Sequence, residues 1–149
     1  MRAERLRAER LRAERLRADG VETAATALGG TSAFVTLASM EFERLVDFYS
    51  QLLGQAARPY QPNRYAEFQL PGLRLAIFRP KIDQAGEFAA PGSGAMSLCL
   101  EVVEVAGAIA HLTRLGYPPL GPVITASHGR EVYAYDPDGN RLILHQGPS

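Results

Sequence analysis

Two segments of the chain place apolar residues at helical spacing. Apolar side chains recur every three or four positions over residues 42–53 and again over residues 105–115. Ser39 precedes the first segment as a candidate N-cap, because serine side chains accept hydrogen bonds from free backbone N–H groups there. A glycine follows each segment, Gly54 and Gly116, and glycine commonly ends a helix by adopting a positive φ. The pattern predicts two amphipathic helices.

The remaining apolar residues form short runs that favour strands over helices. Pro71-Gly72 separates two of these runs, and Asp136-Pro-Asp-Gly-Asn140 separates two others; both are typical turn sequences because proline fixes φ and glycine accepts a positive φ. We therefore expect hairpins at both places. The predicted strands cover residues 33–38, 64–70, 73–79, 95–102, 122–126, 131–135 and 141–146.

The order of predicted elements occurs twice along the chain, which indicates an internal duplication. Residues 32–80 and 95–146 each predict a βαβββ module, and residues 81–94 form a connector that contains Gly, Ala and Pro. The expected fold class is α+β, with one domain over residues 32–146. Two such modules can form a curved mixed sheet around a cleft.

The N-terminal segment is a perfect short repeat. The pentapeptide RAERL occurs at residues 2–6, 7–11 and 12–16. All of its residues form helices readily, but a five-residue period does not align the leucines into a coiled-coil stripe. We expect an Arg-rich exposed helix or a disordered tail, followed by a linker that reaches residue 31. The alternative, a basic arm that contacts RNA, a membrane or a partner, lacks an aromatic or apolar anchor.

Composition limits the possible functions. The formal net charge is zero, but seven of the 16 basic residues lie within residues 1–19, so the rest of the chain is mildly acidic and nucleic acid is not the expected ligand. The single cysteine, Cys99, excludes a disulfide framework and a Cys-based zinc site. No apolar run is long enough to span a bilayer, and the charged N-terminus differs from a signal peptide. A cytoplasmic location, without membrane partners, is the expectation.

Several motifs, in order and spacing, carry a family resemblance. The chain resembles the glyoxalase/bleomycin resistance protein/extradiol dioxygenase (vicinal oxygen chelate) superfamily over residues 32–146. The resemblance implies the two-module fold with its cleft. It does not imply one reaction, because the family includes isomerases, dioxygenases, thiol transferases, epimerases and metal-free drug-binding proteins. The motifs are residues 34–37, 43–44, 48–49 and 53–54 in the first module, and residues 97–102, 115–116, 133, 136–140 and 144 in the second.

The resemblance also implies where enzymes of the family hold a divalent metal with His and Glu side chains. The positions that usually carry His are Phe34 and Ser97 here, and the last-strand position that usually carries Glu is Ile143. A further position, used by some members, falls near Gln69. Phenyl and butyl groups offer no lone pair, and Ser and Gln are weak neutral ligands for a hard cation. We therefore expect no metal and no other cofactor.

Strand alternation predicts which residues line the cleft. A slip of one residue would turn Leu98, Leu100, Leu142 and Leu144 into the cleft, which is implausible. The wall would be aromatic and polar, which suits an organic ligand. Alternatively, the bulky side chains fill the space of the absent metal or pack a dimer interface. The predicted cleft residues are Phe34, Thr36, Tyr65, Glu67, Gln69, Ser97, Cys99, Glu101, Tyr133, Tyr135, Ile143 and His145.

These observations favour a metal-free protein that binds, sequesters or senses a small molecule over an enzyme. The resemblance also implies a homodimer, which is habitual in the family. One alternative is a lyase, isomerase or dioxygenase that uses a relocated metal or His145 as a base. Another is a non-catalytic structural or regulatory dimer. We expect His111 at the surface of the second helix, His128 in a solvated turn, and Cys99 as an inert thiol, and there is no phosphate-binding loop, dinucleotide fingerprint or nucleophile elbow.

Overall fold

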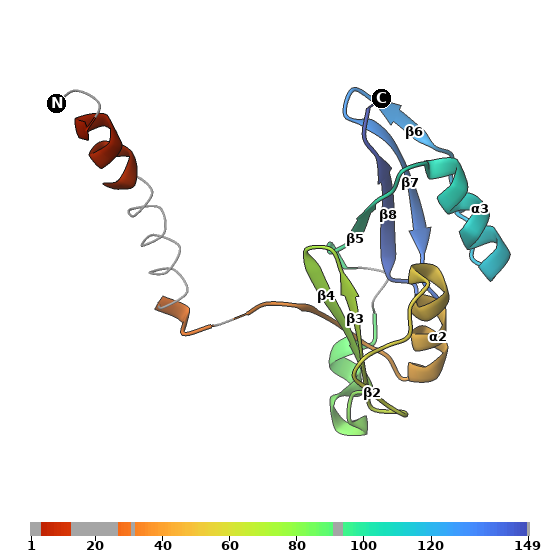
Figure 1. Ribbon diagram of the computed structural model, residues 1–149. Helices are drawn as coiled ribbons and strands as arrows, with labels where there is room; N and C mark the ends of the chain where they lie inside the picture. Colours follow the sequence, from red (N-terminus) through yellow and green to blue (C-terminus); the bar gives the residue numbers. More distant parts are fainter. Residues whose placement is uncertain (1–3, 13–26, 31, 91–93, 149) are drawn as a thin grey trace. The chain divides into compact units, whose positions relative to one another are not determined.

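The computed structural model describes residues 4–12, 27–30, 32–90 and 94–148 (Figure 1). The chain divides into two compact units, Met1–Ala33 and Phe34–Ser149. In the first unit, residues 4–12 are helical with exposed side chains, and Arg5 Nε lies 3.6 Å from Glu9 Oε1. This agrees with the exposed helix predicted from the repeat, whereas the third repeat and most of the linker lie outside the described residues.

The first half of the second unit is a four-stranded mixed sheet with one helix. Its strands lie in the order β1-β4-β3-β2, with β1 parallel to β4 and the other pairs antiparallel. The parallel pair sets Val35 opposite Leu75. The elements are β1 (Val35–Ala38), α2 (Phe42–Leu53), β2 (Tyr60–Gln61), β3 (Tyr65–Leu70) and β4 (Leu73–Phe78).

The second half repeats this arrangement, which confirms the predicted α+β duplication. Its sheet has the order β5-β8-β7-β6, again with a parallel first pair, and Leu98 lies opposite Leu142. A 3₁₀ helix, η1 (Ile82–Phe88), occupies part of the connector between the halves. The elements are β5 (Leu98–Glu101), α3 (Val105–Leu115), β6 (Ile124–Ala126), β7 (Gly129–Tyr135) and β8 (Arg141–Gln146).

Two local features differ from the sequence prediction. Ser39 is not the N-cap of α2, because the helix begins at Phe42 after Glu41; Ser39 Oγ instead accepts a hydrogen bond from the Glu41 backbone N–H at 3.1 Å. Strand β2 was not predicted, because the flanking residues Pro59, Pro62 and Asn63 indicate a turn. It forms because Tyr60 pairs with Ala66 of β3, and this pairing supplies the strand that completes the first βαβββ module.

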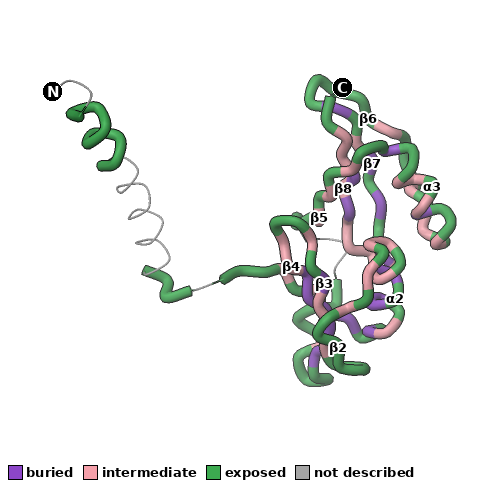
Figure 2. The backbone as a smooth tube through the Cα atoms, in the orientation of Figure 1, coloured by how far each residue is buried: buried purple, intermediate pink, exposed green. Residues whose placement is uncertain are grey.

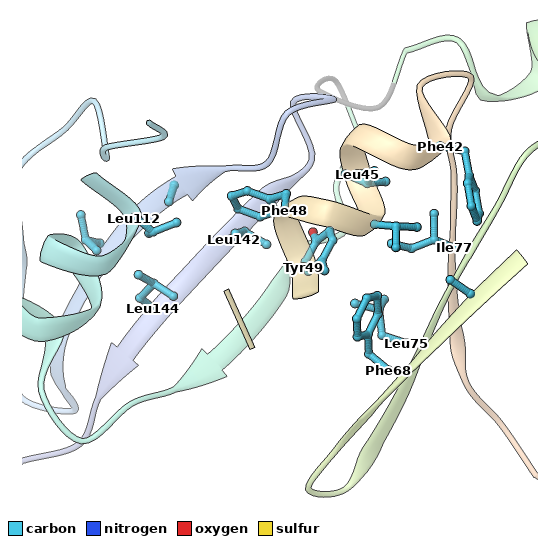
Figure 3. Packing of buried hydrophobic residues seen from close by; sticks show 14 of the residues in the cluster. Phe42, Leu45, Phe48, Tyr49, Phe68, Leu75, Ile77, Leu112, Leu142 and Leu144 are labelled. Carbon is cyan, nitrogen blue, oxygen red and sulfur yellow. The ribbon is translucent and has the colours of Figure 1, made fainter. Parts of the chain in front are cut away.

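One hydrophobic core joins both halves. Helix α2 lies between the two sheets, with Phe68, Leu75 and Ile77 on one side and Leu142 on the other (Figure 3). Along β3 and β7, buried residues alternate with more exposed ones, whereas the consecutive residues Leu75, Ala76 and Ile77 of β4 are all buried (Figure 2). Because Leu142 and Leu144 are both buried, the predicted strand register is confirmed.

Polar and aromatic contacts reinforce this junction. The Tyr49 hydroxyl of α2 donates a hydrogen bond of 2.7 Å to Asp136 Oδ2 in the β7–β8 turn, and both residues are buried. Burial and the neighbouring Asp136 carboxylate raise the pKa of Tyr49 well above its ordinary value. Phe48 meets Tyr117 edge to face, with ring centroids 5.1 Å apart. Helix α2 therefore belongs structurally to both halves.

Candidate functional site

The predicted cleft residues lie on the sheet faces that point away from the core. Along β3, Ala66 and Phe68 are fully buried, while their neighbours Tyr65 and Glu67 are half-buried. Along β7, Ala134 is buried, while Tyr133 and Tyr135 on either side are exposed. One face of each sheet is therefore accessible from outside the single chain.

A charged and aromatic cluster covers this face of the first sheet. The Tyr65 hydroxyl donates a hydrogen bond of 2.9 Å to Glu67 Oε1, and burial followed by this bond raises the pKa of Tyr65. Arg74 Nε lies 3.3 Å from the same oxygen, an ion pair whose angle does not make a hydrogen bond. The Arg74 guanidinium carbon stands 4.1 Å from the centroid of the Phe34 ring, a cation–π contact.

The second sheet repeats this geometry at equivalent positions. Each sheet has one parallel strand pair, in which Val35 lies opposite Leu75 and Leu98 lies opposite Leu142. The residues one position earlier are therefore equivalent: Phe34 corresponds to Ser97, and Arg74 corresponds to Arg141. Arg141 Nε donates a hydrogen bond of 2.8 Å to Ser97 Oγ, and Arg141 Nη2 donates one to the carbonyl of Gly94 at 2.6 Å. In both sheets an arginine contacts the residue at the position where the sequence resemblance led us to expect a metal-binding His.

These contacts show that the usual metal positions do not fit a divalent cation. Phe34 has no donor atom and already carries a guanidinium against its ring. The Ser97 oxygen accepts from Arg141, so a cation there would meet a positive charge. Ile143 has no donor atom. Among the described residues, no group of three or more His, Cys, Asp or Glu side chains could hold a metal ion.

A hydrogen-bonded chain of titratable groups lies further along the second sheet. His145 Nδ1 is 2.8 Å from Glu101 Oε2, and His145 Nε2 is 3.2 Å from His128 Nδ1 and 3.0 Å from the His128 carbonyl oxygen. The bond to Glu101 is the main reason that the pKa of His145 is raised. A carboxylate that orients an imidazole in this way can support acid–base chemistry.

Two other predicted residues have simple surroundings. Cys99 is exposed as a residue, but partial desolvation of its thiol, followed by the nearby Glu101 and Glu131 carboxylates, raises the pKa of that thiol. A raised pKa keeps the thiol protonated, which supports the expectation that Cys99 is unreactive. His111 Nε2 lies 2.9 Å from the Gln51 carbonyl oxygen and so joins α3 to α2, a structural role.

The structure brings together Tyr65 with Glu67 and Glu101 with His145, each pair within one sheet. The surface hollows lie away from these residues, except that Glu101 borders one of them. One, of about 500 Å³, is lined by α2 and the segment after it, including Asp47 and Gln55. Another, of about 590 Å³, runs between α3 and the ends of β5 and β8 and is bordered by Glu101. The predicted cleft residues therefore form two open faces within one chain.

Sequence reasoning missed both arginines and the contact made by His128. Arg74 is the second residue of β4, after the Pro71-Gly72 turn, and Arg141 is the first residue of β8, after the Asp138-Gly139 turn. Their equivalent registers could have been found by aligning the two halves of the duplication. His128 gave no such signal, because its position depends on how the β6–β7 turn folds back over β8.

A family model described as the glyoxalase/bleomycin resistance protein/dioxygenase superfamily matches residues 31–144. A search of curated proteins found no match. No helix in the described ranges is both long and apolar enough to cross a membrane.

Solved structures share the fold. A glyoxalase-related enzyme from Fulvimarina pelagi is 27% identical with a TM-score of 0.64, and the match covers 79% of this chain and 89% of that one. A fosfomycin resistance protein from Listeria monocytogenes, in complex with Mn(II) and sulfate, is 19% identical with a TM-score of 0.62, covering 79% and 90%. The bleomycin resistance determinant of transposon Tn5 is 22% identical with a TM-score of 0.57, covering 80% and 100%.

Proposed function

Because the chain belongs to the glyoxalase/bleomycin resistance protein/dioxygenase superfamily, we propose that it binds a small organic molecule without a divalent metal, as a sequestering or sensing protein. The observation that carries the proposal is the pair of arginines that contact Phe34 and Ser97, the two residues at the expected metal-ligand positions. Arg74 covers Phe34, and Arg141 holds Ser97. Each guanidinium supplies a fixed positive charge where enzymes of the family use a metal ion.

The chemistry of the two faces indicates what the ligand carries. The contacts of Arg141 are a hydroxyl and a carbonyl rather than a carboxylate, so its charge is available to an anionic group. Tyr133 and Tyr135 offer aromatic surface on the same sheet. Guanidinium groups bind carboxylates and phosphates through paired N–H donors. A flat or aromatic molecule with a carboxylate or phosphate group satisfies both features.

A homodimer would complete the site. The open faces expose Phe34 at 42%, Tyr133 at 42% and Tyr135 at 39% of their surface, which is large for aromatic side chains in a folded domain. A second copy that covers these faces would exclude water from the ligand and from the arginines. Each cleft would then have two walls, as the sequence resemblance implies.

Metal analysis tests the central claim. Untagged protein is incubated with Mn²⁺, Fe²⁺, Ni²⁺ or Zn²⁺, passed through gel filtration and analysed by mass spectrometry for bound metal. We expect far less than one ion per chain. A matched variant, Phe34→His with Ser97→His and Ile143→Glu, restores the donor set and serves as the positive control. About one retained ion per natural chain would overturn the proposal.

Ligand binding is tested by thermal shift against small aromatic acids, phosphates and dicarbonyl compounds. We expect a saturable rise in Tm with an anionic aromatic ligand. The rise in Tm should be lost in Tyr133→Ala and reduced in Arg141→Leu. It should persist in the control Arg130→Leu, because strand alternation places Arg130 on the opposite face of β7 from Tyr133. A shift unchanged in both test variants would contradict binding at this face.

The contact between Glu101 and His145 favours a second candidate, a metal-independent enzyme in which His145 is the base. In the structure, His145 Nε2 already contacts His128, so a substrate would have to displace that side chain. Turnover of a bound compound that disappears in His145→Gln, while binding remains, would favour this candidate over simple sequestration.

A further inference from the structure

Glu101, His145 and His128 are linked by hydrogen bonds, and these include more hydrogen-bond contacts to His145 than its neutral imidazole can satisfy. Its Nδ1 faces a carboxylate and needs a proton to donate. Its Nε2 faces the carbonyl oxygen of His128, which only accepts hydrogen bonds, so Nε2 needs a proton as well. All contacts are satisfied together only when both nitrogens of His145 are protonated, that is, when the side chain is an imidazolium.

The ring of His128 fits this state. Its Nδ1 lies 3.2 Å from His145 Nε2, and the two rings are inclined by only 26°. With His145 as the donor, His128 Nδ1 accepts and its own proton sits on Nε2. In the neutral state of His145 the direction reverses: His128 Nδ1–H donates to Nε2, and the Nε2 lone pair then faces the carbonyl oxygen, which repels it.

A close backbone approach positions His128 over His145. Gly129 follows His128 and begins β7 with φ at +126°, in the region that favours glycine. A Cβ at this position would collide with the carbonyl oxygen of Gln146, the residue after His145. The turn therefore lies directly against β8, and a change in the His145 hydrogen bonds acts on the β6–β7 hairpin at short range.

We propose that Glu101, His145 and His128 form a proton-binding site that fastens the β6–β7 hairpin to the second sheet. With the proton bound, His145 bridges the Glu101 carboxylate of β5 and the backbone of the turn. Without it, the contact with the His128 carbonyl opens, and the imidazole–imidazole bond is the remaining link between the His145 side chain and the turn. The hairpin continues into the strand that carries Tyr133, so protonation controls the edge of the proposed binding face.

The groups around His145 favour the bound proton. Glu101 reaches it from β5, and Glu131 lies opposite it on β7. Cys99, also on β5, keeps a neutral thiol because its pKa is raised. The pKa of His145 is raised above its ordinary value, chiefly by the bond to Glu101. Since the folded protein then binds the proton more tightly than the unfolded chain, the stabilisation is present at low pH and is lost as pH rises through the folded-state pKa.

The test combines two measurements on the full chain, in the presence of EDTA so that no trace metal bridges the imidazoles. NMR titration follows both histidine rings and identifies which nitrogens carry protons. Hydrogen exchange follows the amide protection of residues 126–129. We expect His145 to titrate above the ordinary histidine value, with both nitrogens protonated below the transition. Protection of the hairpin should fall several-fold as pH rises through the same transition.

Variants separate the proposal from a general pH effect. Glu101→Gln is isosteric at a mostly exposed side chain, and it should move both transitions to lower pH together. Glu104→Gln, an exposed carboxylate at the start of α3, should leave them unchanged. His128→Ala keeps the backbone carbonyl and should preserve the protection step. An ordinary or lowered His145 pKa, a step that ignores Glu101→Gln, or protection without a step would each overturn the proposal.

Discussion

At the scale of single residues, backbone geometry sets firmer limits than side-chain identity. Gly129 adopts a positive φ and lies against the carbonyl of Gln146, so two independent constraints exclude a side chain there. Nothing in the sequence distinguishes this glycine from the others in turns. The constraint comes from strand β8 passing behind it, which only the folded chain reveals.

Gly129→Ala should therefore destabilise the protein strongly. The added Cβ collides with backbone that cannot move aside, and the positive φ adds strain, so we expect a loss of about 3 kcal/mol or more in the free energy of unfolding. Urea denaturation of purified protein measures it. A loss of less than about 1 kcal/mol in the free energy of unfolding would show that the β8 backbone at Gln146 shifts to accommodate the methyl group, and would contradict this expectation.

The buried pair of Tyr49 and Asp136 sets a second residue-scale expectation. Asp136 also accepts from the backbone N–H groups of Asp138 and Asn140 and from the Asn140 side chain. Asp136→Ala removes all of these bonds and leaves the Tyr49 hydroxyl unpaired, and should cost about 3 kcal/mol. Tyr49→Phe keeps the turn intact and should cost about 1–2 kcal/mol. Equal losses in the two variants, by chemical denaturation, would contradict this ranking.

At the scale of elements, the sequence predicted what depends on local pattern and missed what depends on pairing. Both helices and all the longer strands follow from periodicity and turn residues. Strand β2 does not, because Tyr60–Gln61 is extended only through its pairing with β3. The site shows the same division: alternation placed Glu101 and His145 on one face, whereas the contacts of Arg74 and His128 depend on neighbouring chain segments.

Helix α3 contains a glycine whose replacement should stabilise the protein. Gly107 lies within Val105–Leu115, and a Cβ there would meet no atom within 4 Å. Alanine loses less backbone entropy than glycine in a helix, so Gly107→Ala should raise the free energy of unfolding by about 0.5–1 kcal/mol. Gly107→Ala, measured by the same urea denaturation, is the control variant for Gly129→Ala. Both substitutions add a single methyl group, but they should change the free energy of unfolding in opposite directions.

At the scale of the whole molecule, the two open faces carry aromatic side chains that a single chain leaves uncovered. The aromatic residues on them are exposed in the single chain, while the opposite sides of the same strands are fully buried. The sequence could suggest a dimer only through its family resemblance. The exposed aromatic side chains are the physical argument for the proposed dimer, because a second chain would cover them.

Analytical ultracentrifugation should accordingly find a dimer. Tyr133→Asp places a charge in the proposed interface and should shift the protein toward monomer. Leu120→Asp changes an equally apolar residue that is 88% exposed in the loop before β6, and should leave the dimer intact. A natural chain that stays monomeric at high concentration would contradict the proposed two-walled cleft.

The position of α2 between the two sheets has a consequence for the origin of the duplicated βαβββ module. An ancestor of half this length would have exposed the side of its helix that, in α2, packs against the second sheet. It would therefore have needed a second copy of itself to bury that side. If the gene were divided within the connector, neither product should fold when expressed separately. Produced together, the two fragments should reassemble around the hydroxyl of Tyr49 and the carboxylate of Asp136.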